Sequence, residues 1–421
     1  MRLPFLPSGS GMKWLVYDWD QRSVINVYIP GPDVEETFVF EAVAKFIEQL
    51  PADVVAVKLD RAGDLVSTSS DLNHDRAWIP FYPPRTDFPR RVPTIRRRDL
   101  TEVDRLGLQV DLATYPDPDP SRPGEKRKVV FKYYLAENSV VTWWHEANCV
   151  LRMPSHPNIV PFDALVVDRI EHVDRVVGFT TRYVPGGTLH QNKDRVFKLK
   201  YLQQLINAVD HLNLRLGIVH GDICPWNLLI DAKTDAIQLF DFNCAAKLGW
   251  KGDEDHRFEF EYEENRNDVK FVIYTVYELI TREFCFREEF YPDELNASKL
   301  MRKAKWTAHK DAKLDSPVTE YRRVLNDWAK QRAEMDKKVD HFTKASEPLN
   351  WPALRVDPSM VWDRGPIRLR GRLRGTLTQM GKGFLRWERP PTRSLPLPEG
   401  QRLLATGEVV QDVTPGASAK K

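Results

Sequence analysis

The sequence predicts an α+β fold, because stretches with strand-like spacing and stretches with helix-like spacing of apolar residues both occur. Near the start, strands are predicted at residues 13–28 and 54–59, with a helix at residues 34–50 between them. Farther along, apolar residues recur at three- and four-residue steps from 202 to 216, which indicates an amphipathic helix. Residues 269–280 are apolar on nearly every face, which is typical of a buried helix.

The composition fits a soluble globular protein. The 421 residues are 42% hydrophobic, enough for one large core or two, and the formal net charge of +2 gives no global attraction to nucleic acid. Four cysteines lie scattered without the spacing of metal ligands, which predicts a reducing compartment. No apolar run marks a signal peptide or a membrane span. We therefore expect an intracellular protein, cytoplasmic or nuclear, with no membrane contact and no nucleic-acid partner.

A proline-rich stretch divides the chain. Residues 77–99 hold prolines with aromatic residues between them, which excludes a central strand or helix and predicts an extended linker. Residues 1–76 before it form the predicted N-terminal α+β extension. Residues 346–421 form a C-terminal extension with a disordered tail and a basic segment, residues 364–393, in which arginines alternate with small or apolar residues. We interpret these arginines, like the triplet at residues 96–98, as structural or solvated rather than as a nucleic-acid site.

The most informative stretch begins at His220. Asp222 supplies one carboxylate, Asn227 follows five residues later in the same loop, and Asp241 comes after a hairpin predicted at residues 227–241. Phosphoryl transfer needs one carboxylate near the attacking hydroxyl and separate oxygen ligands for Mg²⁺. The spacing therefore predicts an ATP-dependent phosphotransferase.

The set His-x-Asp-x-x-x-x-Asn followed by Asp-Phe resembles the catalytic loop and the metal-binding motif of the protein-kinase-like superfamily. The resemblance implies a bilobal fold, with a small β-rich lobe over residues 100–184 and a larger helical lobe over residues 185–345. It implies ATP and Mg²⁺ as cofactors. Asp222 would be the catalytic base, and Asn227 and Asp241 would be magnesium ligands.

A second set of residues supports the same resemblance. Residues 129–132, Val-Val-Phe-Lys, resemble the kinase strand whose lysine contacts the phosphates of ATP. A helix predicted at residues 142–153 carries Glu146 and leads into His-Pro-Asn-Ile-Val at residues 156–160, which matches the family. The resemblance therefore pairs Lys132 with Glu146. The alternative is a surface lysine and a glutamate that faces water.

The adenine pocket is predicted from the resemblance alone. Residues 176–189 contain a strand and a Pro-Gly-Gly turn, like the hinge between the kinase lobes. The adenine edge would bond backbone groups near Arg182 and Val184. Val130 and Leu229 would line the pocket.

Several positions depart from the family pattern. One glycine, Gly107, stands where kinases usually have three, which weakens backbone contacts to phosphate. Gly221 replaces an arginine and Cys224 replaces a lysine. The segment between Asp241 and Asp268 is short for docking a peptide. Asp268 itself would bond the backbone of the catalytic loop or act as a simple helix cap.

The leading prediction is a kinase that transfers the γ-phosphate of Mg-ATP to a protein serine or threonine. His-Gly-Asp also resembles the loop of aminoglycoside, choline and RIO kinases, which leaves a small-molecule acceptor as an alternative. The weak glycine loop leaves a third possibility, a pseudokinase that acts as a binding module. As a whole, the chain resembles the divergent kinase-like proteins common in filamentous fungi. The sequence does not identify the acceptor.

Overall fold

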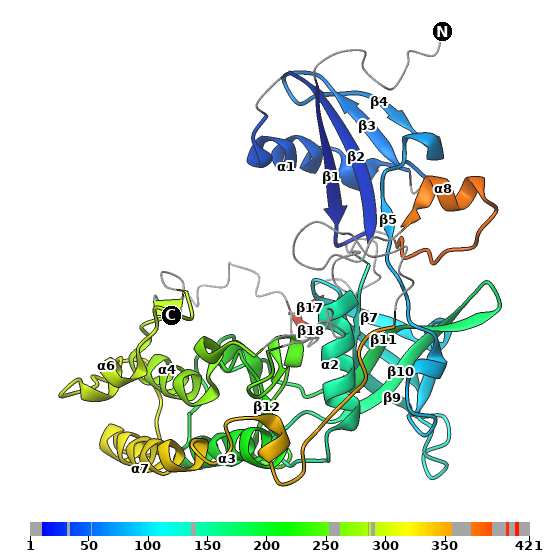
Figure 1. Ribbon diagram of the computed structural model, residues 1–421. Coiled ribbons are helices and arrows are strands. Elements are labelled where there is room, and N and C mark those ends of the chain that lie inside the picture. The colour runs from blue at the N-terminus through cyan, green and yellow to red at the C-terminus, as the bar shows by residue number, and fades with distance from the viewer. Residues whose placement is uncertain are drawn as a thin grey trace, which may run out of the picture.

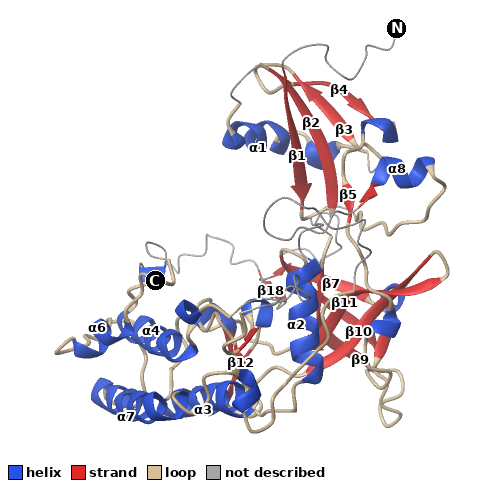
Figure 2. Ribbon diagram, in the orientation of Figure 1, coloured by secondary structure: helices blue, strands red, loops and turns tan. Residues whose placement is uncertain are grey.

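The computed structural model divides into an N-terminal unit, a strand-rich small lobe below it and a helical large lobe beside that (Figures 1 and 2). The predicted α+β fold with two lobes is confirmed. Among the residues that the structure describes, no helix is both long and apolar enough to cross a bilayer. The described residues are 11–31, 34–51, 53–135, 140–251, 262–284, 286–287, 291–355, 372–389, 401–403 and 409–411.

The N-terminal unit is a four-stranded sheet covered by one helix. Its first two strands form an antiparallel hairpin, and the helix then crosses over to a third strand that runs parallel to the second. Val27, Val39 and Val57 are fully buried between sheet and helix. The elements are β1 (Gly11–Asp18), β2 (Ser23–Pro30), α1 (Glu36–Ala44), β3 (Ala56–Leu59) and β4 (Leu65–Ser69).

Helix α1 is shorter than the helix predicted at residues 34–50. It ends at Ala44, and only a 3₁₀ turn at Ile47–Gln49 follows. Phe46 leaves helical geometry with φ −136°, and its ring is buried in the core of the unit. Tertiary packing of this ring therefore overrides the local helical pattern.

The small lobe is a six-stranded sheet with one long helix against it. The strand order is β6-β10-β11-β9-β8-β7. The segment predicted as a proline-rich linker contains two 3₁₀ turns and also joins the sheet, because β6 pairs in parallel with β10 at its edge. The elements are β6 (Thr94–Arg96), β7 (Thr101–Gly107), β8 (Val110–Pro116), β9 (Lys126–Tyr133), α2 (Val140–Arg152), β10 (Phe162–Ile170) and β11 (Val173–Arg182).

The large lobe is built around one buried helix, as predicted for residues 269–280. This helix, α4, keeps its side chains from Phe271 to Thr281 buried. A second helix, α3, packs beside it and continues as a π-helical turn at His211–Arg215. The other elements are short β pairs and outer helices. The bounds are α3 (Leu199–Asp210), β12 (Ile218–Val219), β13 (Leu228–Asp231), β14 (Ala236–Leu239), β15 (Ala246–Lys247), α4 (Asp268–Thr281), α6 (Ala297–Arg302) and α7 (Val318–Asp336).

Helix α7 ends before the apolar pattern in the sequence does. Apolar residues continue at helix-like spacing to Val339 and Phe342, but α7 ends at Asp336. The chain then turns back, and the backbone N–H of Phe342 donates to the carbonyl of Leu248 at 2.7 Å. Pro317 precedes the helix, and no side chain caps its first turn, although Ser316 directly before Pro317 is a residue type that often caps helices.

Residues 372–389, called the C-terminal segment below, lie against the N-terminal unit. Strand β16 (Arg372–Leu373) pairs with β5 (Trp78–Ile79), and the short helix α8 (Arg374–Gln379) follows. Figure 1 shows α8 beside the four-stranded sheet. A last hairpin joins β17 (Gln401–Leu403) to β18 (Val409–Gln411). Arg364, Arg368, Arg370, Arg393 and the predicted disordered tail lie outside the described residues.

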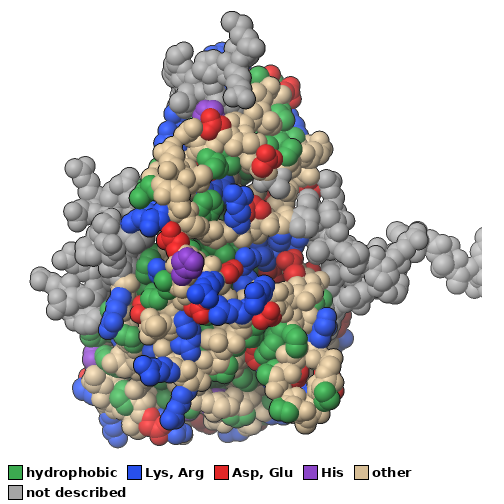
Figure 3. Space-filling view, turned by 90° about the vertical axis from the view of Figure 1, so that its right-hand side faces the viewer, with side chains coloured by type: hydrophobic (Ala, Val, Ile, Leu, Met, Phe, Trp, Pro, Cys, Tyr) green, Lys and Arg blue, Asp and Glu red, His purple; other side chains and the backbone are tan. Residues whose placement is uncertain are grey.

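The surface charges are mixed. On the face shown in Figure 3, lysine and arginine side chains gather across the middle with acidic side chains among them. Arg96 of the arginine triplet binds both carboxylate oxygens of Asp174, at 2.7 and 2.8 Å. Arg97 binds Asp168 at 2.6 Å. Arg98, which is mostly exposed, lies 3.8 Å from Asp99, so each of the three arginines has a carboxylate within ion-pair distance rather than being simply solvated.

Gly178 of β11 provides a test of the sheet packing. A Cβ at this position would lie 2.5 Å from the carbonyl oxygen of Lys132 and 2.5 Å from the ring of Phe131. We expect Gly178→Ala to lower the free energy of unfolding by about 1–3 kcal/mol, because the added methyl overpacks the sheet. Denaturant unfolding measures this change.

Gly107→Ala is the matched control. Nothing lies within 4 Å of a Cβ at Gly107. That variant should be neutral or slightly stabilising, since alanine restricts the unfolded chain. Equal stability losses in the two variants would contradict the packing argument.

Candidate active site

Asp268, the first residue of α4, binds the backbone of the predicted catalytic loop. Its Oδ1 accepts from the backbone N–H of Gly221 at 2.9 Å, and its Oδ2 accepts from the backbone N–H of His220 at 2.8 Å. Oδ2 also accepts from the side chain of Asn213 at 2.8 Å. Asn267 caps the helix by accepting from the N–H of Lys270. Asp268 therefore bonds the loop, and the alternative in which it is the helix cap is wrong.

The loop needs glycine at position 221. Gly221 has φ +77°, and a Cβ there would lie 2.5 Å from the carbonyl oxygen of Cys244. Because both the backbone conformation and the space exclude a side chain, an arginine does not fit here. Arg266 approaches from another segment instead, with its Nη1 at 3.3 Å from the carbonyl of Gly221.

Asp222 and Asn227 meet across the loop. The amide Nδ2 of Asn227 donates to the backbone carbonyl of Asp222 at 2.8 Å and to its Oδ2 at 3.0 Å. These bonds use the amide nitrogen and leave the amide oxygen of Asn227 for another partner. The spacing of the two residues in the sequence thus becomes a direct contact.

Asp241 stands at the end of the hairpin formed by β13 and β14. It has a left-handed backbone, with φ 66°. Asn243 follows it and donates weakly to Asp241 Oδ2, at 3.4 Å. The Oδ1 of Asn243 is buried and has no hydrogen-bond partner among the described residues. Asn243 was not among the site residues predicted from the sequence.

These donors fit a magnesium ion. Mg²⁺ prefers oxygen ligands and keeps several positions for water and substrate phosphates. Asp241 and the amide oxygens of Asn227 and Asn243 are oxygen donors of this kind. Across the described part of the chain, no three His, Cys, Asp or Glu side chains gather into a metal cluster. Water and nucleotide phosphates would therefore complete the coordination.

Lys132 joins the two lobes. Its Nζ lies 2.7 Å from Oε1 of Glu146 on α2 and 2.5 Å from Oδ1 of Asp241. Burial alone would lower the pKa of Lys132, but the two carboxylates raise it above its ordinary value, so the side chain stays protonated. Burial opposes ionisation of Asp241, yet Lys132 keeps its pKa below the usual range. A surface lysine and a solvent-facing glutamate, the alternative for this pair, do not fit this geometry.

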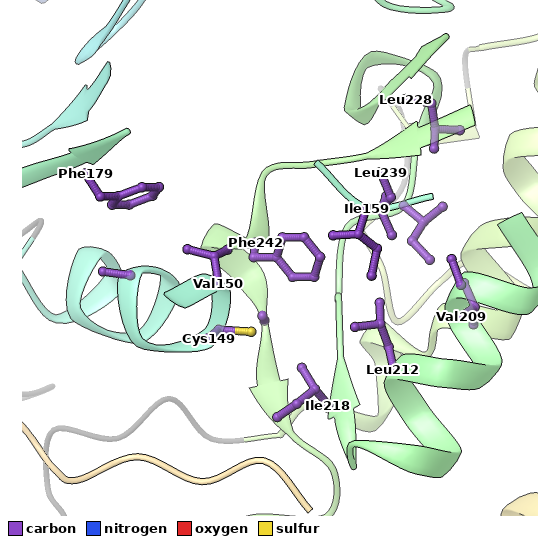
Figure 4. Packing of buried hydrophobic residues seen from close by; sticks show 14 of the residues in the cluster. Cys149, Val150, Ile159, Phe179, Val209, Leu212, Ile218, Leu228, Leu239 and Phe242 are labelled. Carbon is purple, nitrogen blue, oxygen red and sulfur yellow. The ribbon is translucent and has the colours of Figure 1, made fainter. Parts of the chain in front are cut away.

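Phe242 packs between the lobes. Its ring is buried and lies 4.7 Å, centroid to centroid, from the ring of His220. Figure 4 shows the ring between Cys149 and Val150 of α2 on one side and Ile159 and Leu212 on the other. His220, two residues before Asp222, and Phe242, directly after Asp241, are thus packing residues.

The structure places the predicted hinge residues next to β13. Arg182 binds Asp231 at 3.0 Å. Val184 is buried, and Leu229 lies half-buried in β13, which meets Thr188 in an isolated β-bridge. Val130 pairs with Thr181 across the sheet, two residues before Lys132. The contact between Arg182 and Asp231 had no signal in the sequence.

The hairpin between β7 and β8 differs from a flexible phosphate loop. Its turn is made by Leu108 and Gln109, and Gln109 has φ 59°. The carbonyl oxygen of Gln109 accepts from the N–H of Tyr133 at 3.0 Å, and its side-chain oxygen accepts from the N–H of Leu135 at 2.9 Å. The tip of the hairpin is therefore attached to the end of β9. The single glycine suggested a weak loop, but this attachment was not predicted.

A buried ion pair between Arg287 and Glu278 of α4 is connected to the predicted catalytic loop through Thr275. Arg287 binds Oε1 of Glu278 at 2.7 Å and donates to Oγ1 of Thr275 at 3.0 Å. The hydroxyl of Thr275 donates to the carbonyl of Ile223 at 3.0 Å. Burial raises the pKa of Glu278 to about 7, against the attraction of Arg287. Sequence reasoning did not find this chain of contacts.

The described cysteines pack rather than form a reactive site. Cys149 and Cys224 are buried, and burial raises the pKa of both thiols. Cys244 is half-buried, and burial raises its pKa to about 11. Cys285 lies outside the described residues.

A comparison with protein-family models matches the stretch of the chain in which the candidate site lies. Residues 125–264 match the sequence model of the protein kinase domain. That stretch contains Lys132, Glu146, Asp222, Asn227 and Asp241. The β7–β8 hairpin, α4 and the N-terminal unit lie outside it.

Three curated relatives show the extent of the similarity. CBL-interacting serine/threonine-protein kinase 16 of Arabidopsis thaliana is 38% identical over 105 residues, 24% of this chain and 21% of the relative. CBL-interacting protein kinase 3 of Oryza sativa subsp. japonica is 32% identical over 131 residues, 28% and 26% of the two chains. Serine/threonine-protein kinase nekl-2 of Caenorhabditis elegans is 29% identical over 131 residues, 27% and 34%.

The chain therefore spans between 21% and 34% of the length of these three relatives. The family model, in turn, covers 125–264 and no other part of the chain. None of the three relatives is fungal, and the resemblance to fungal kinase-like proteins stays a prediction.

Asp268 can be tested against its neighbour Asn267. Asp268→Ala leaves three hydrogen-bond donors without their acceptor, so we expect the free energy of unfolding to fall by more than about 3 kcal/mol. Asn267→Ala removes only the helix cap and should cost about 1 kcal/mol. Denaturant unfolding measures both. Equal losses would show that the bonds from Asp268 to the loop contribute little.

Glu146 predicts a pH dependence. Burial raises its pKa to about 7 in spite of Lys132. Because an acid with a raised pKa binds its proton more tightly in the folded chain, its contribution to stability falls as the pH rises from 4.5 towards 7. The ionised form is the one that holds Lys132. We therefore expect affinity for Mg-ATP to increase with pH through about 7 while Tm decreases.

Glu146→Gln is the variant that isolates this effect. It removes the titrating group and keeps the shape of the side chain. Nucleotide affinity and Tm, measured across the same pH range, should lose the part of their pH dependence that Glu146 causes. An unchanged pH profile in the variant would assign the dependence to another group.

Proposed function

We propose that this chain is an ATP-dependent protein kinase that transfers the γ-phosphate of Mg-ATP to a serine or threonine hydroxyl. Asp222 would accept the proton of the attacking hydroxyl. Asn227 and Asp241 would hold the magnesium ion, which neutralises charge on the phosphates. Lys132, oriented by Glu146, would bind the phosphates from the small lobe. The adenine would lie against Val130 and Leu229 and bond the backbone near Arg182 and Val184.

The observation that carries this proposal is the position of Lys132. One protonated side chain from the small lobe contacts a carboxylate on α2 and a carboxylate of the large lobe. Phosphoryl transfer depends on positioned charges of this kind, because the protein contributes little covalent chemistry. The match of residues 125–264 to the kinase domain supports the same reading.

A second candidate is a pseudokinase that binds nucleotide and turns it over slowly. The hydrogen bonds from Tyr133 and Leu135 to Gln109 favour it. They fix the tip of the β7–β8 hairpin against β9, so its backbone N–H groups are less free to bind phosphate. A small-molecule acceptor is a further alternative, suggested by the His-Gly-Asp sequence of the loop.

The test is ATP turnover by wild type, Asp241→Ala and Asp222→Asn. We expect wild type to phosphorylate a library of serine and threonine peptides. Asp222→Asn should reduce kcat by about 100-fold or more, because the proton acceptor is lost. Asp241→Ala should abolish turnover. Asp327→Ala removes an exposed aspartate on α7 and should leave activity unchanged.

The same measurements separate the candidates. Turnover with aminoglycosides or choline, but not with peptides, would replace the protein-kinase proposal with a small-molecule kinase. Tight Mg-ATP binding without turnover in wild type would indicate a pseudokinase. The lack of both binding and turnover would overturn the site assignment.

A further inference from the structure

The small-lobe sheet has two faces with different partners. Side chains alternate between the faces along a strand. Val110 of β8 pairs with Lys132 of β9, and the next pair, Asp111 and Phe131, points to the opposite face. Lys132 faces α2 and the large lobe, so Asp111 lies on the outer face of the sheet. That outer face is covered by the N-terminal unit and the C-terminal segment.

Two arginines from distant parts of the chain bind Asp111. Arg22, from the turn between β1 and β2, contacts Oδ2 of Asp111, and Arg389 of the C-terminal segment lies 2.9 Å from Oδ1. Arg389 also lies 2.9 Å from Glu102 of β7. The Asp111 side chain is 1% exposed and the two arginines are 8% and 7% exposed. These charges therefore interact with little screening by water.

The same network includes the strand on the other side of the hairpin. Arg105 of β7 binds Glu102 at 2.7 Å and Asp20 of the N-terminal unit at 2.5 Å. The positive charges of three arginines in this network thus equal the negative charges of three carboxylates. Burial opposes ionisation of Glu102, but Arg105, Arg389 and Arg22 keep its pKa below the ordinary value. Both strands that lead to the hairpin tip are held from the outer face.

Aromatic rings extend the contact to β9. Tyr133, next to Lys132, stacks on Trp387 of the C-terminal segment with ring centroids 4.7 Å apart. The guanidinium of Arg22 lies 4.3 Å from the centre of the Tyr133 ring and also bonds its hydroxyl, at 2.8 Å. Trp387 donates to the hydroxyl of Tyr82 at 2.7 Å. The residue that follows Lys132 is therefore fixed by the two docked segments.

The C-terminal segment and the N-terminal unit also bind each other. The N–H of Arg389 donates to the carbonyl of Gln21 at 2.9 Å, and its Nε donates to the carbonyl of Asp20 at 2.6 Å. Arg374 makes an ion pair with Asp75. Figure 1 shows the two regions side by side above the small lobe. They form one docked unit on the outer face of the sheet.

We propose that Arg22 and Arg389 are positioning residues for nucleotide binding, which hold Lys132 and the β7–β8 hairpin in place by binding Asp111 from the outer face of the sheet. This inference rests on the proposed kinase function. It assigns the N-terminal unit and the C-terminal segment a direct role in the affinity for Mg-ATP. The coupling passes through one pair of strands, since Asp111 adjoins the residue that pairs with Lys132.

The experiment compares Arg22→Ala, Arg389→Ala and Arg389→Lys with the wild-type full chain. We expect each alanine variant to raise KM for Mg-ATP about five- to tenfold, with kcat and the KM for the acceptor peptide nearly unchanged. Amides of β7, β8 and β9 should exchange with deuterium about tenfold faster, because the strands open more often. Arg389→Lys should restore part of both losses, since it keeps the charge.

Arg374→Ala is the matched control. Within the described residues its ion pairs go to Asp75 and Glu388 and to no strand of the six-stranded sheet. It should lower Tm without changing KM for Mg-ATP. An unchanged KM and unchanged exchange in Arg22→Ala and Arg389→Ala would overturn the inference, and so would equal changes in Arg374→Ala.

A failure of the proposed kinase function can be distinguished from a failure of the positioning role of Arg22 and Arg389. A wild type that neither binds nor turns over Mg-ATP would refute the proposed function. The exchange rates of the strands would still decide whether the two arginines hold β8 and β9, because that measurement needs no nucleotide.

Discussion

The structure depends on one shared cation. Lys132 lies between a carboxylate of its own lobe and a carboxylate at the end of a hairpin in the other lobe, and each of these acids alone would be costly to bury. A protonated lysine offsets part of that cost for both. The arrangement therefore fixes the distance between the lobes at the point where a nucleotide would enter. It also explains why the pKa values of the two acids shift in opposite directions. Against the effect of burial, Lys132 lowers the pKa of Asp241, whereas the deeper burial of Glu146 raises its pKa.

A second level of support comes from α4. Asp268 binds two backbone groups of the loop, and the Asn213 side chain that it also binds accepts a hydrogen bond from Arg332 of α7 at 2.9 Å. Three helices are thus connected to the loop by buried polar contacts. Such networks are rigid when every member is satisfied, because breaking one bond leaves a buried group without a partner. The position of Asp222 is therefore set by the large lobe, and the position of Lys132 by the small lobe.

The sequence predicted the centre of the molecule better than its edges. The hairpin between Asn227 and Asp241, the buried helix after Asp268 and the helix that carries Glu146 follow from short-range patterns, which survive because they coincide with the tertiary fold. The end of α1 and the end of α7 did not follow, since Phe46 and Phe342 turn into cores formed by distant segments. Ion pairs such as Arg389 with Asp111 join residues with no common motif, so no pattern in the sequence marks them. The basic C-terminal segment could be recognised as charged, but its partners could not.

The docked C-terminal segment also bears on how the chain is made. Asp20 and Arg389 are 369 residues apart, yet their contact closes the outer face of the small lobe. Contacts this far apart in sequence form slowly, because a long loop has to be closed before they stabilise anything. During synthesis, the N-terminal unit and the strands around Lys132 leave the ribosome long before Trp387 and Arg389 do. Part of the outer face of the small lobe therefore stays uncovered until Trp387 and Arg389 have been synthesised. Folding of the small lobe is completed only after that.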